Sequence, residues 1–102
     1  MAEYRVVVSE RADRMLVQHA RFLARVSENA ALRMTDAFED VLDALESNPF
    51  QFPVETDYNL PAGRYRKALF AKWYKALFSV DGKTVYLDMV LDCRQDNQSH
   101  RS

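Results

Sequence analysis

Two helical patterns separated by only four residues constrain this chain more than any other feature of its sequence. Apolar residues recur at steps of three and four along residues 10–26, and the same spacing repeats along residues 31–45. The Ser-Glu-Asn at 27–29 between them is typical of a helix start. So short a connection predicts an antiparallel helical hairpin, with the second helix ending near Ser47. Each helix has one apolar stripe, and both stripes need another layer to cover them.

Four short runs rich in β-branched and aromatic residues predict the strands of that layer: Tyr4–Val8, Tyr65–Phe70, Trp73–Val80 and Thr84–Leu91. Asp81-Gly82, between the last two runs, is a strong signal for a tight hairpin turn. Period-two alternation places Tyr74, Ala76, Phe78 and Val80 on one face opposite Val85, Leu87, Met89 and Leu91, or gives the reverse parity.

A loop is predicted for residues 48–63, which contain all three prolines and no clear period. We expect it to return Phe50, Phe52 or Leu60 to the core. A chain of 102 residues fits a single domain over residues 1–102. The predicted fold is therefore α+β: an N-terminal strand and an antiparallel helical hairpin packed on a mainly antiparallel four-stranded sheet.

Composition indicates a folded protein that is neither exported nor membrane-bound. Hydrophobic residues make up 48% of the chain, and no apolar run approaches the length of a membrane span. The single cysteine, Cys93, cannot form an intrachain disulfide or a multi-cysteine zinc site, which favours a reducing compartment. We therefore expect a cytoplasmic protein without a metal or other cofactor, in which Cys93 serves as a small, buried apolar residue.

Charge is divided unevenly along the chain. Residues 1–62 contain six Lys or Arg against eleven Asp or Glu, and residues 63–102 contain eight against four. Within residues 64–75 there is no acid, and cations alternate with aromatic rings: Arg64, Tyr65, Arg66, Lys67, Phe70, Lys72, Trp73, Tyr74 and Lys75. Such a mixture suits phosphates and bases, but it also suits the solvent-facing side of a sheet. Of Trp73 and Tyr74, we expect at least one to be core.

The order of elements and several local motifs resemble the RelE/ParE superfamily of bacterial toxins from type II toxin-antitoxin modules, also known as plasmid stabilisation systems. The motifs cover nearly the whole chain: Tyr4–Ala12, Leu45–Pro49, Tyr65–Lys67, Tyr74–Val80 and Val85–Asp96. Most of these positions define the fold and few define the chemistry. The resemblance implies a growth-inhibiting toxin.

The RelE branch of that superfamily cleaves mRNA in the ribosomal A site without a metal, by general acid–base and electrostatic catalysis. Matching motif to motif, the resemblance assigns that catalytic set to Arg66, Lys75, Arg94 and His100, with Arg64, Lys67, Lys72, Trp73 and Tyr74 as RNA- or target-binding residues. Ala68 stands where the branch has a second lysine, and Arg66 stays protonated, so the general base is unassigned.

The ParE branch has the same fold, lacks the catalytic set and poisons DNA gyrase by protein contact. A sequence pI near 6.1 suits a protein target better than it suits rRNA phosphates. The sequence leaves three functions open: mRNA interferase, gyrase poison and a non-toxic binding module. For each, the resemblance implies a cognate antitoxin bound in the groove between hairpin and sheet and on the basic patch. A homodimer is also left open.

Two further residues have structural interpretations that compete with functional ones. His19 lies on the apolar stripe of the first helix, which favours a neutral core histidine with one hydrogen bond. Arg94 lies between Asp92 and Asp96, so it can form a local salt bridge at the end of the last strand, while the resemblance gives it a functional role.

Overall fold

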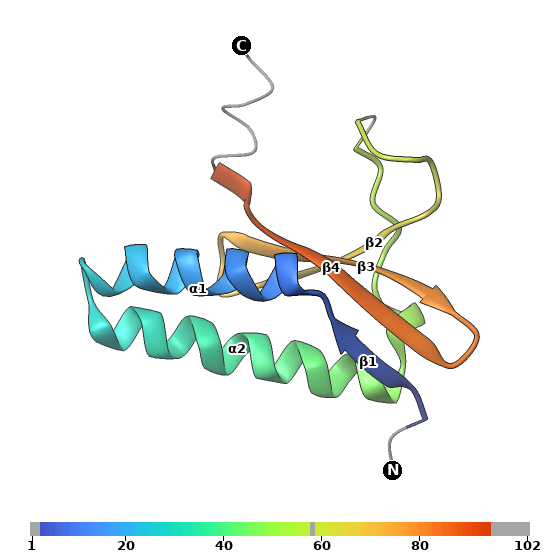
Figure 1. Ribbon diagram of the computed structural model, residues 1–102, viewed down its shortest axis with the longest axis horizontal. Coiled ribbons are helices and arrows are strands. Elements are labelled where there is room, and N and C mark those ends of the chain that lie inside the picture. Colours follow the sequence, from blue (N-terminus) through green and yellow to red (C-terminus); the bar gives the residue numbers. More distant parts are fainter. Residues whose placement is uncertain (1–2, 58, 95–102) are drawn as a thin grey trace.

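The computed structural model describes residues 3–57 and 59–94, and its elements follow the predicted order (Figure 1). Strand β1 (Arg5–Val8) leads into helices α1 (Glu10–Ala24) and α2 (Glu28–Ser47). A short 3-10 helix, η1 (Pro49–Gln51), opens the loop, and β2 (Arg66–Phe70), β3 (Tyr74–Asp81) and β4 (Thr84–Asp92) complete the chain. The predicted α+β class is confirmed. Neither described helix is long and apolar enough to span a membrane.

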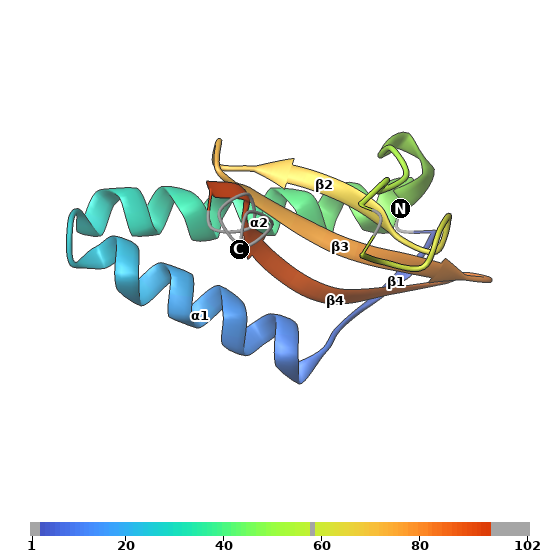
Figure 2. The ribbon, with the colours of Figure 1, turned by 90° about the horizontal axis from the view of Figure 1, so that it is seen from above.

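The four strands form one mixed sheet in the order β1-β4-β3-β2. The two hairpin-connected pairs, β2 with β3 and β3 with β4, are antiparallel, while β1 lies parallel to β4. The hairpin covers one face of this sheet. Seen from above, β2 and β3 pass over α2, and α1 lies beside β4 (Figure 2).

Both helices begin at serines whose side chains cap them. Ser9 Oγ accepts from the Ala12 amide at 3.0 Å, and Ser27 Oγ accepts from the Ala30 amide at 3.1 Å. The first helix ends at Ala24, two residues before the predicted end, because the Arg25 and Val26 amides donate three residues back in a tightened last turn. The hairpin therefore closes within three residues, as the spacing of the two apolar patterns predicts.

The core lies between the hairpin and the inner face of the sheet. Its fully buried residues come from both helices and from β2, β3 and β4, and include Ala12, Met34, Phe38, Leu45, Ala68, Phe70, Tyr74, Ala76, Phe78, Val85, Leu87 and Val90. Val6 and Val8 of β1, and Tyr4 just before that strand, pack against this cluster on the predicted face. Phe52 is the loop residue that returns to the core, where its ring meets Phe78 edge-on at 5.8 Å.

A β-bulge at Asp88 corrects the predicted parity of the last strand. Phe78 pairs with Leu87 while Leu77 pairs with Met89, so Asp88 has no opposite residue. Beyond it the alternation reverses, and Val90 enters the core in place of the predicted Met89 and Leu91. The bulge also leaves the Asp88 carbonyl free to accept from Ser9 Oγ at 3.1 Å.

Candidate functional site

A buried ion cluster joins the proline-containing loop to the outer face of the sheet. Glu55, only 6% exposed, accepts from Lys75 Nζ at 2.6 Å through one oxygen. Its other oxygen lies 3.5 Å from Lys67 Nζ and accepts from the backbone amides of Thr56 and Asp57. Burial alone would raise the pKa of Glu55, but these lysines and hydrogen bonds hold it below its usual value. Both lysines thus share a single carboxylate as their ion-pair partner.

Arg66 lies on the opposite face of the sheet from Lys75. Side chains alternate along a strand, so Arg66 shares the inner face with Ala68 and Phe70, both in the core. Its guanidinium donates to the Phe52 carbonyl at 2.7 Å and lies 5.1 Å from the centre of the Phe50 ring. Lys75 stands between the core residues Tyr74 and Ala76, and so faces outward. The structure therefore separates two members of the predicted catalytic set.

The end of β4 carries a local salt bridge between Arg94 and Asp92. The guanidinium donates to both oxygens of the Asp92 carboxylate, at 3.3 and 3.2 Å, and the Arg94 amide donates to the same group at 2.9 Å. Burial opposes ionisation of Asp92, yet the hydrogen bonds from Arg94 lower its pKa. Roughly half of the Arg94 side chain stays exposed, at 48%. The predicted salt bridge to Asp92 is confirmed; Asp96 lies outside the described residues.

Trp73 joins this strand end to the turn between β2 and β3. Arg94 lies 4.8 Å and Lys72 5.4 Å from the Trp73 ring centre, both within cation–π range. The Cys93 amide, on a half-buried residue, donates to the Trp73 carbonyl at 2.6 Å. Trp73 is 42% exposed while Tyr74 is buried, so one of the two is core, as predicted.

The turn that carries these residues has an unusual backbone. Ala71 and Lys72 have φ angles of 47° and 75°, in the left-handed region that non-glycine residues seldom occupy. Two such residues in succession form the left-handed turn that a tight β-hairpin needs, at a steric cost because neither is glycine. Here the strained turn places Lys72 and Trp73 at the rim of a groove.

This groove, of about 390 Å³, runs between the closed end of the helical hairpin and the β2–β3 turn. Its walls combine apolar and basic side chains: Leu23, Ala30, Arg33 and Met34 from the hairpin, and Ala71, Lys72, Trp73 and Tyr74 from the sheet. Packed rings lie beneath the groove. The centre of the Tyr74 ring is 5.8 Å from the centre of the Phe70 ring and 5.3 Å from the centre of the His19 ring. We call this feature the hairpin–turn groove.

His19 has the structural role that its pattern predicts. Its Nε2 lies 2.9 Å from the Val90 carbonyl oxygen, to which it donates, and its ring packs on Tyr74 beneath the groove. This contact ties α1 to β4. The hydrogen bond to Val90 and the packing on Tyr74 explain the position of His19 without a catalytic role.

The predicted site residues therefore fall into separate groups. Lys72, Trp73, Tyr74 and Arg94 meet at one end of the sheet, Lys67 and Lys75 lie in the ion cluster, and Arg66 is on the other face. Arg64 stacks on Tyr65 at 5.7 Å beside a polar hollow lined by Ser79, Tyr86 and Asp88. His100 lies outside the described residues.

Sequence reasoning missed Glu55 and Arg33. Glu55 lies in a segment with no period, and its lysine partners are 12 and 20 residues away in the chain, so no local pattern marks it. Arg33 looks like an ordinary exposed helix residue until the β2–β3 turn is placed beside it. Among residues 3–57 and 59–94, no three His, Cys, Asp or Glu side chains gather closely enough to hold a metal ion.

Comparison with known proteins shows a similarity of fold. No family model matches the chain, and no curated protein matches it. Among solved structures, it is similar to a chain of the chromosomal ParDE TA system from P. aeruginosa, with a TM-score of 0.69 and 14% identity over 88% of this chain and 96% of that chain. The similarity shows that the two chains share a fold, in agreement with the RelE/ParE-like architecture that the motifs indicate.

Proposed function

We propose that this chain is the toxin of a type II toxin-antitoxin pair and that it acts by protein contact, in the manner of a gyrase poison. The ParDE system to which its fold is similar supports the toxin-antitoxin assignment. A cytoplasmic target, such as gyrase, agrees with a sequence that contains a single cysteine. The choice of protein contact over RNA cleavage rests on the placement of the basic residues.

The observation that carries this choice is the separation of Arg66 from Lys75. Cleavage of RNA at a 2′-hydroxyl needs a proton acceptor and cationic groups within hydrogen-bond reach of the same phosphate. Arg66 lies on the inner face beneath Phe50, while Lys75 faces the opposite side and is bound by Glu55. One phosphate cannot contact both side chains.

Glu55 does not supply the missing base. As the only carboxylate of the ion cluster, it would have to accept the 2′-hydroxyl proton, yet its side chain is 4% exposed and both oxygens already accept hydrogen bonds. The lowered pKa also makes Glu55 a weaker base than an ordinary glutamate. A substrate hydroxyl would first have to break the contacts that hold the loop on the sheet.

The hairpin–turn groove, by contrast, has the character of a protein-binding surface. Trp73 and Arg94 are exposed and held together, and tryptophan and arginine are the residue types that contribute most at protein interfaces. Arg33 and Lys72 add positive charge on both sides of an apolar floor. The groove therefore suits a partner segment that alternates apolar and acidic side chains.

The cognate antitoxin is the partner that we assign to this groove. If the target uses the same exposed group of Lys72, Trp73 and Arg94, then a bound antitoxin blocks the target by occupying its contact surface. Neutralisation then needs no change in the conformation of the toxin. Substitutions in the groove should weaken both interactions together.

Expression in a bacterial host separates the candidate functions. The expected result is growth arrest with gyrase-linked DNA breaks, while the mRNA in the ribosomal A site stays uncut. Cleavage of mRNA within A-site codons on translating ribosomes would overturn the proposal, and unaffected growth would identify a non-toxic binding module. Trp73→Ala tests the groove, and Lys83→Glu, a charge reversal at the turn between β3 and β4, serves as a control at the far end of the sheet.

A further inference from the structure

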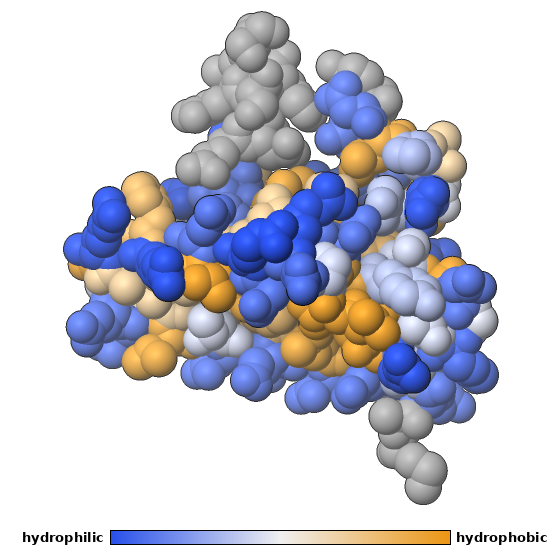
Figure 3. All heavy atoms as spheres, viewed as in Figure 1, coloured by the Kyte–Doolittle hydropathy of each residue, from blue (hydrophilic) through white to orange (hydrophobic). Residues whose placement is uncertain are grey.

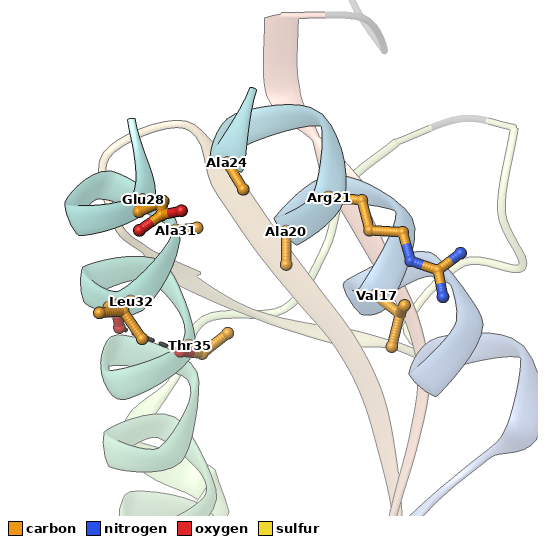
Figure 4. A pocket seen from close by; sticks show the side chains of 8 residues that line it. All are labelled: Val17, Ala20, Arg21, Ala24, Glu28, Ala31, Leu32 and Thr35. Carbon is orange, nitrogen blue, oxygen red and sulfur yellow. Dashed lines mark hydrogen bonds between the residues drawn. The ribbon is translucent and has the colours of Figure 1, made fainter. Parts of the chain in front are cut away.

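A second groove lies on the helical hairpin itself, between α1 and α2. It has a volume of about 430 Å³ and an apolar floor formed by Val17, Ala20 and Ala24 from α1 and by Ala31, Leu32 and Thr35 from α2. Figure 4 shows the α2 side chain Thr35 and the α1 side chain Ala20 directed toward the space between the helices. None of the lining residues belongs to the hairpin–turn groove.

The floor of this groove is exposed and apolar. Leu32 is 61% exposed and Val17 is 39% exposed, although each projects from an otherwise packed hairpin. In Figure 3, orange apolar surface interrupts the blue hydrophilic surface along the line between the two helices. Covering these side chains would remove apolar area from water, so the groove can gain free energy from a partner.

The two walls of the groove carry opposite charges. On α1, Arg21 lines the groove; Arg14 is exposed seven residues earlier on the same side, where it pairs with Glu10 at 3.9 Å, and Arg25 follows the end of the helix. On α2, Glu28, Asp36 and Glu39 are exposed on the side next to Leu32. In Figure 4, Arg21 and Glu28 stand on opposite sides of the groove. Where Arg21 and Glu28 line the groove, the α1 wall is therefore basic and the α2 wall is acidic.

We infer that a second copy of this chain covers this groove, with the two hairpins face to face in a four-helix arrangement. A two-fold axis parallel to the groove sets α1 of each chain against α2 of its partner, so each basic wall meets an acidic wall. An axis across the groove would instead set α1 against α1 and Arg21 against Arg21. Charge complementarity thus favours a second copy of the chain as the partner, and it favours a two-fold axis parallel to the groove. This inference does not rest on the proposed function.

In this arrangement Arg21 of one chain lies opposite Glu28 of the other, because both residues line the same end of the groove. The contact occurs twice in the dimer. α1 has 15 residues and is about 22 Å long, so the interface is short and we expect a dissociation constant in the micromolar range.

Sedimentation equilibrium on the full chain, at concentrations up to roughly 200 μM, measures the association directly. The wild-type chain should dimerise, and Leu32→Asp, Arg21→Glu and Glu28→Arg should each weaken the dimer by at least tenfold. Lys83→Glu, at the other end of the fold, should dimerise as the wild type does. Thermal melts confirm that the variants, all at exposed positions, remain folded.

Mixing the two charge-reversed variants gives the decisive result. Arg21→Glu and Glu28→Arg each place like charges together in their own dimers, but a mixed pair has an acid opposite a base at both contacts. The mixture should therefore form a heterodimer at concentrations where each variant alone is monomeric. A monomeric wild type, or a mixture that stays monomeric, would overturn the inference. The inference would also be overturned if the wild-type protein were monomeric on its own and Arg21→Glu abolished its binding to the antitoxin.

Discussion

The Glu55 carboxylate lies 2.6 Å from the Lys75 ammonium, and this ion pair ties the proline-containing loop to the outer face of the sheet. The pair is almost wholly shielded from water, with side-chain exposures of 4% for Glu55 and 11% for Lys75. Lys67 completes the cluster at 3.5 Å. Lys75, which the family resemblance assigns to RNA cleavage, therefore forms a structural ion pair with Glu55.

Glu55→Ala should destabilise the protein by about 3 kcal/mol, because it removes the carboxylate that pairs with the buried Lys75 ammonium. Urea denaturation, with an unchanged m-value, measures the loss. The double variant Glu55→Gln/Lys75→Met removes both charges and should recover most of the stability. A Glu55→Ala variant as stable as the wild type would show that the ion pair does not hold the loop.

Acid should weaken the wild-type protein through the same carboxylate. The pKa of Glu55 is lowered in the folded state from its ordinary value of 4.5, so the unfolded chain binds its proton first as pH falls. The stability due to this group is fully present above about pH 4.5 and is lost as pH falls through the folded-state pKa. Glu55→Gln should lose less stability than the wild type between pH 6 and pH 3, roughly, in urea titrations. Equal losses would contradict the assignment.

Ala71→Gly should stabilise the protein, because glycine relieves a left-handed conformation that costs a non-glycine residue about 1 kcal/mol or more. The greater freedom of glycine in the unfolded chain offsets part of this gain. We expect a net rise of a few tenths of a kcal/mol, roughly, in the free energy of unfolding. Ala62→Gly, in an exposed loop position without a positive φ, should lower it instead. Loss of stability in Ala71→Gly would mean that the turn is unstrained.

Most of the fold could be predicted from local patterns. The capping serines and apolar stripes define α1 and α2, and Asp81-Gly82 places the β3–β4 hairpin. The bulge at Asp88 could not be predicted, because residues 89–91 are all apolar and fit either parity. A carboxylate inside a strand was the only local sign, and its partners, Arg11 at 3.2 Å and the Tyr65 hydroxyl at 2.9 Å, come from distant segments.

The candidate site was predicted less completely than the fold. Charge and aromatic content identified Lys72 and Trp73, and the family resemblance identified Arg94; the structure brings the three together. The sequence could not show that Arg66 and Lys75 face opposite sides, because the strand parity was left open until the pairing was known. The sequence also could not identify Glu55. Its role depends on where the proline-containing loop folds back onto the sheet, and that loop has no hydrophobic pattern that would place it.

Arg94 should contribute to target binding through its planar guanidinium as well as its charge. It contacts both oxygens of Asp92 and the Trp73 ring, and lysine cannot reproduce this arrangement. Arg94→Ala and Arg94→Lys should both abolish growth arrest. Arg94→Ala should also lose a small part of the stability through the salt bridge to Asp92, while Arg94→Lys, which keeps the charge, should melt close to the wild type. Full toxicity of either variant would show that Arg94 serves only in the local salt bridge to Asp92.

The proposal that this protein acts by protein contact is tested most directly with purified components. The protein is added in parallel to DNA gyrase with a supercoiling substrate and to ribosomes translating a labelled mRNA. The account predicts inhibition of gyrase that is lost in Trp73→Ala, kept in Lys83→Glu and relieved by the antitoxin, with the mRNA intact. Cleavage of the mRNA in the ribosomal A site, with gyrase unaffected, would contradict it.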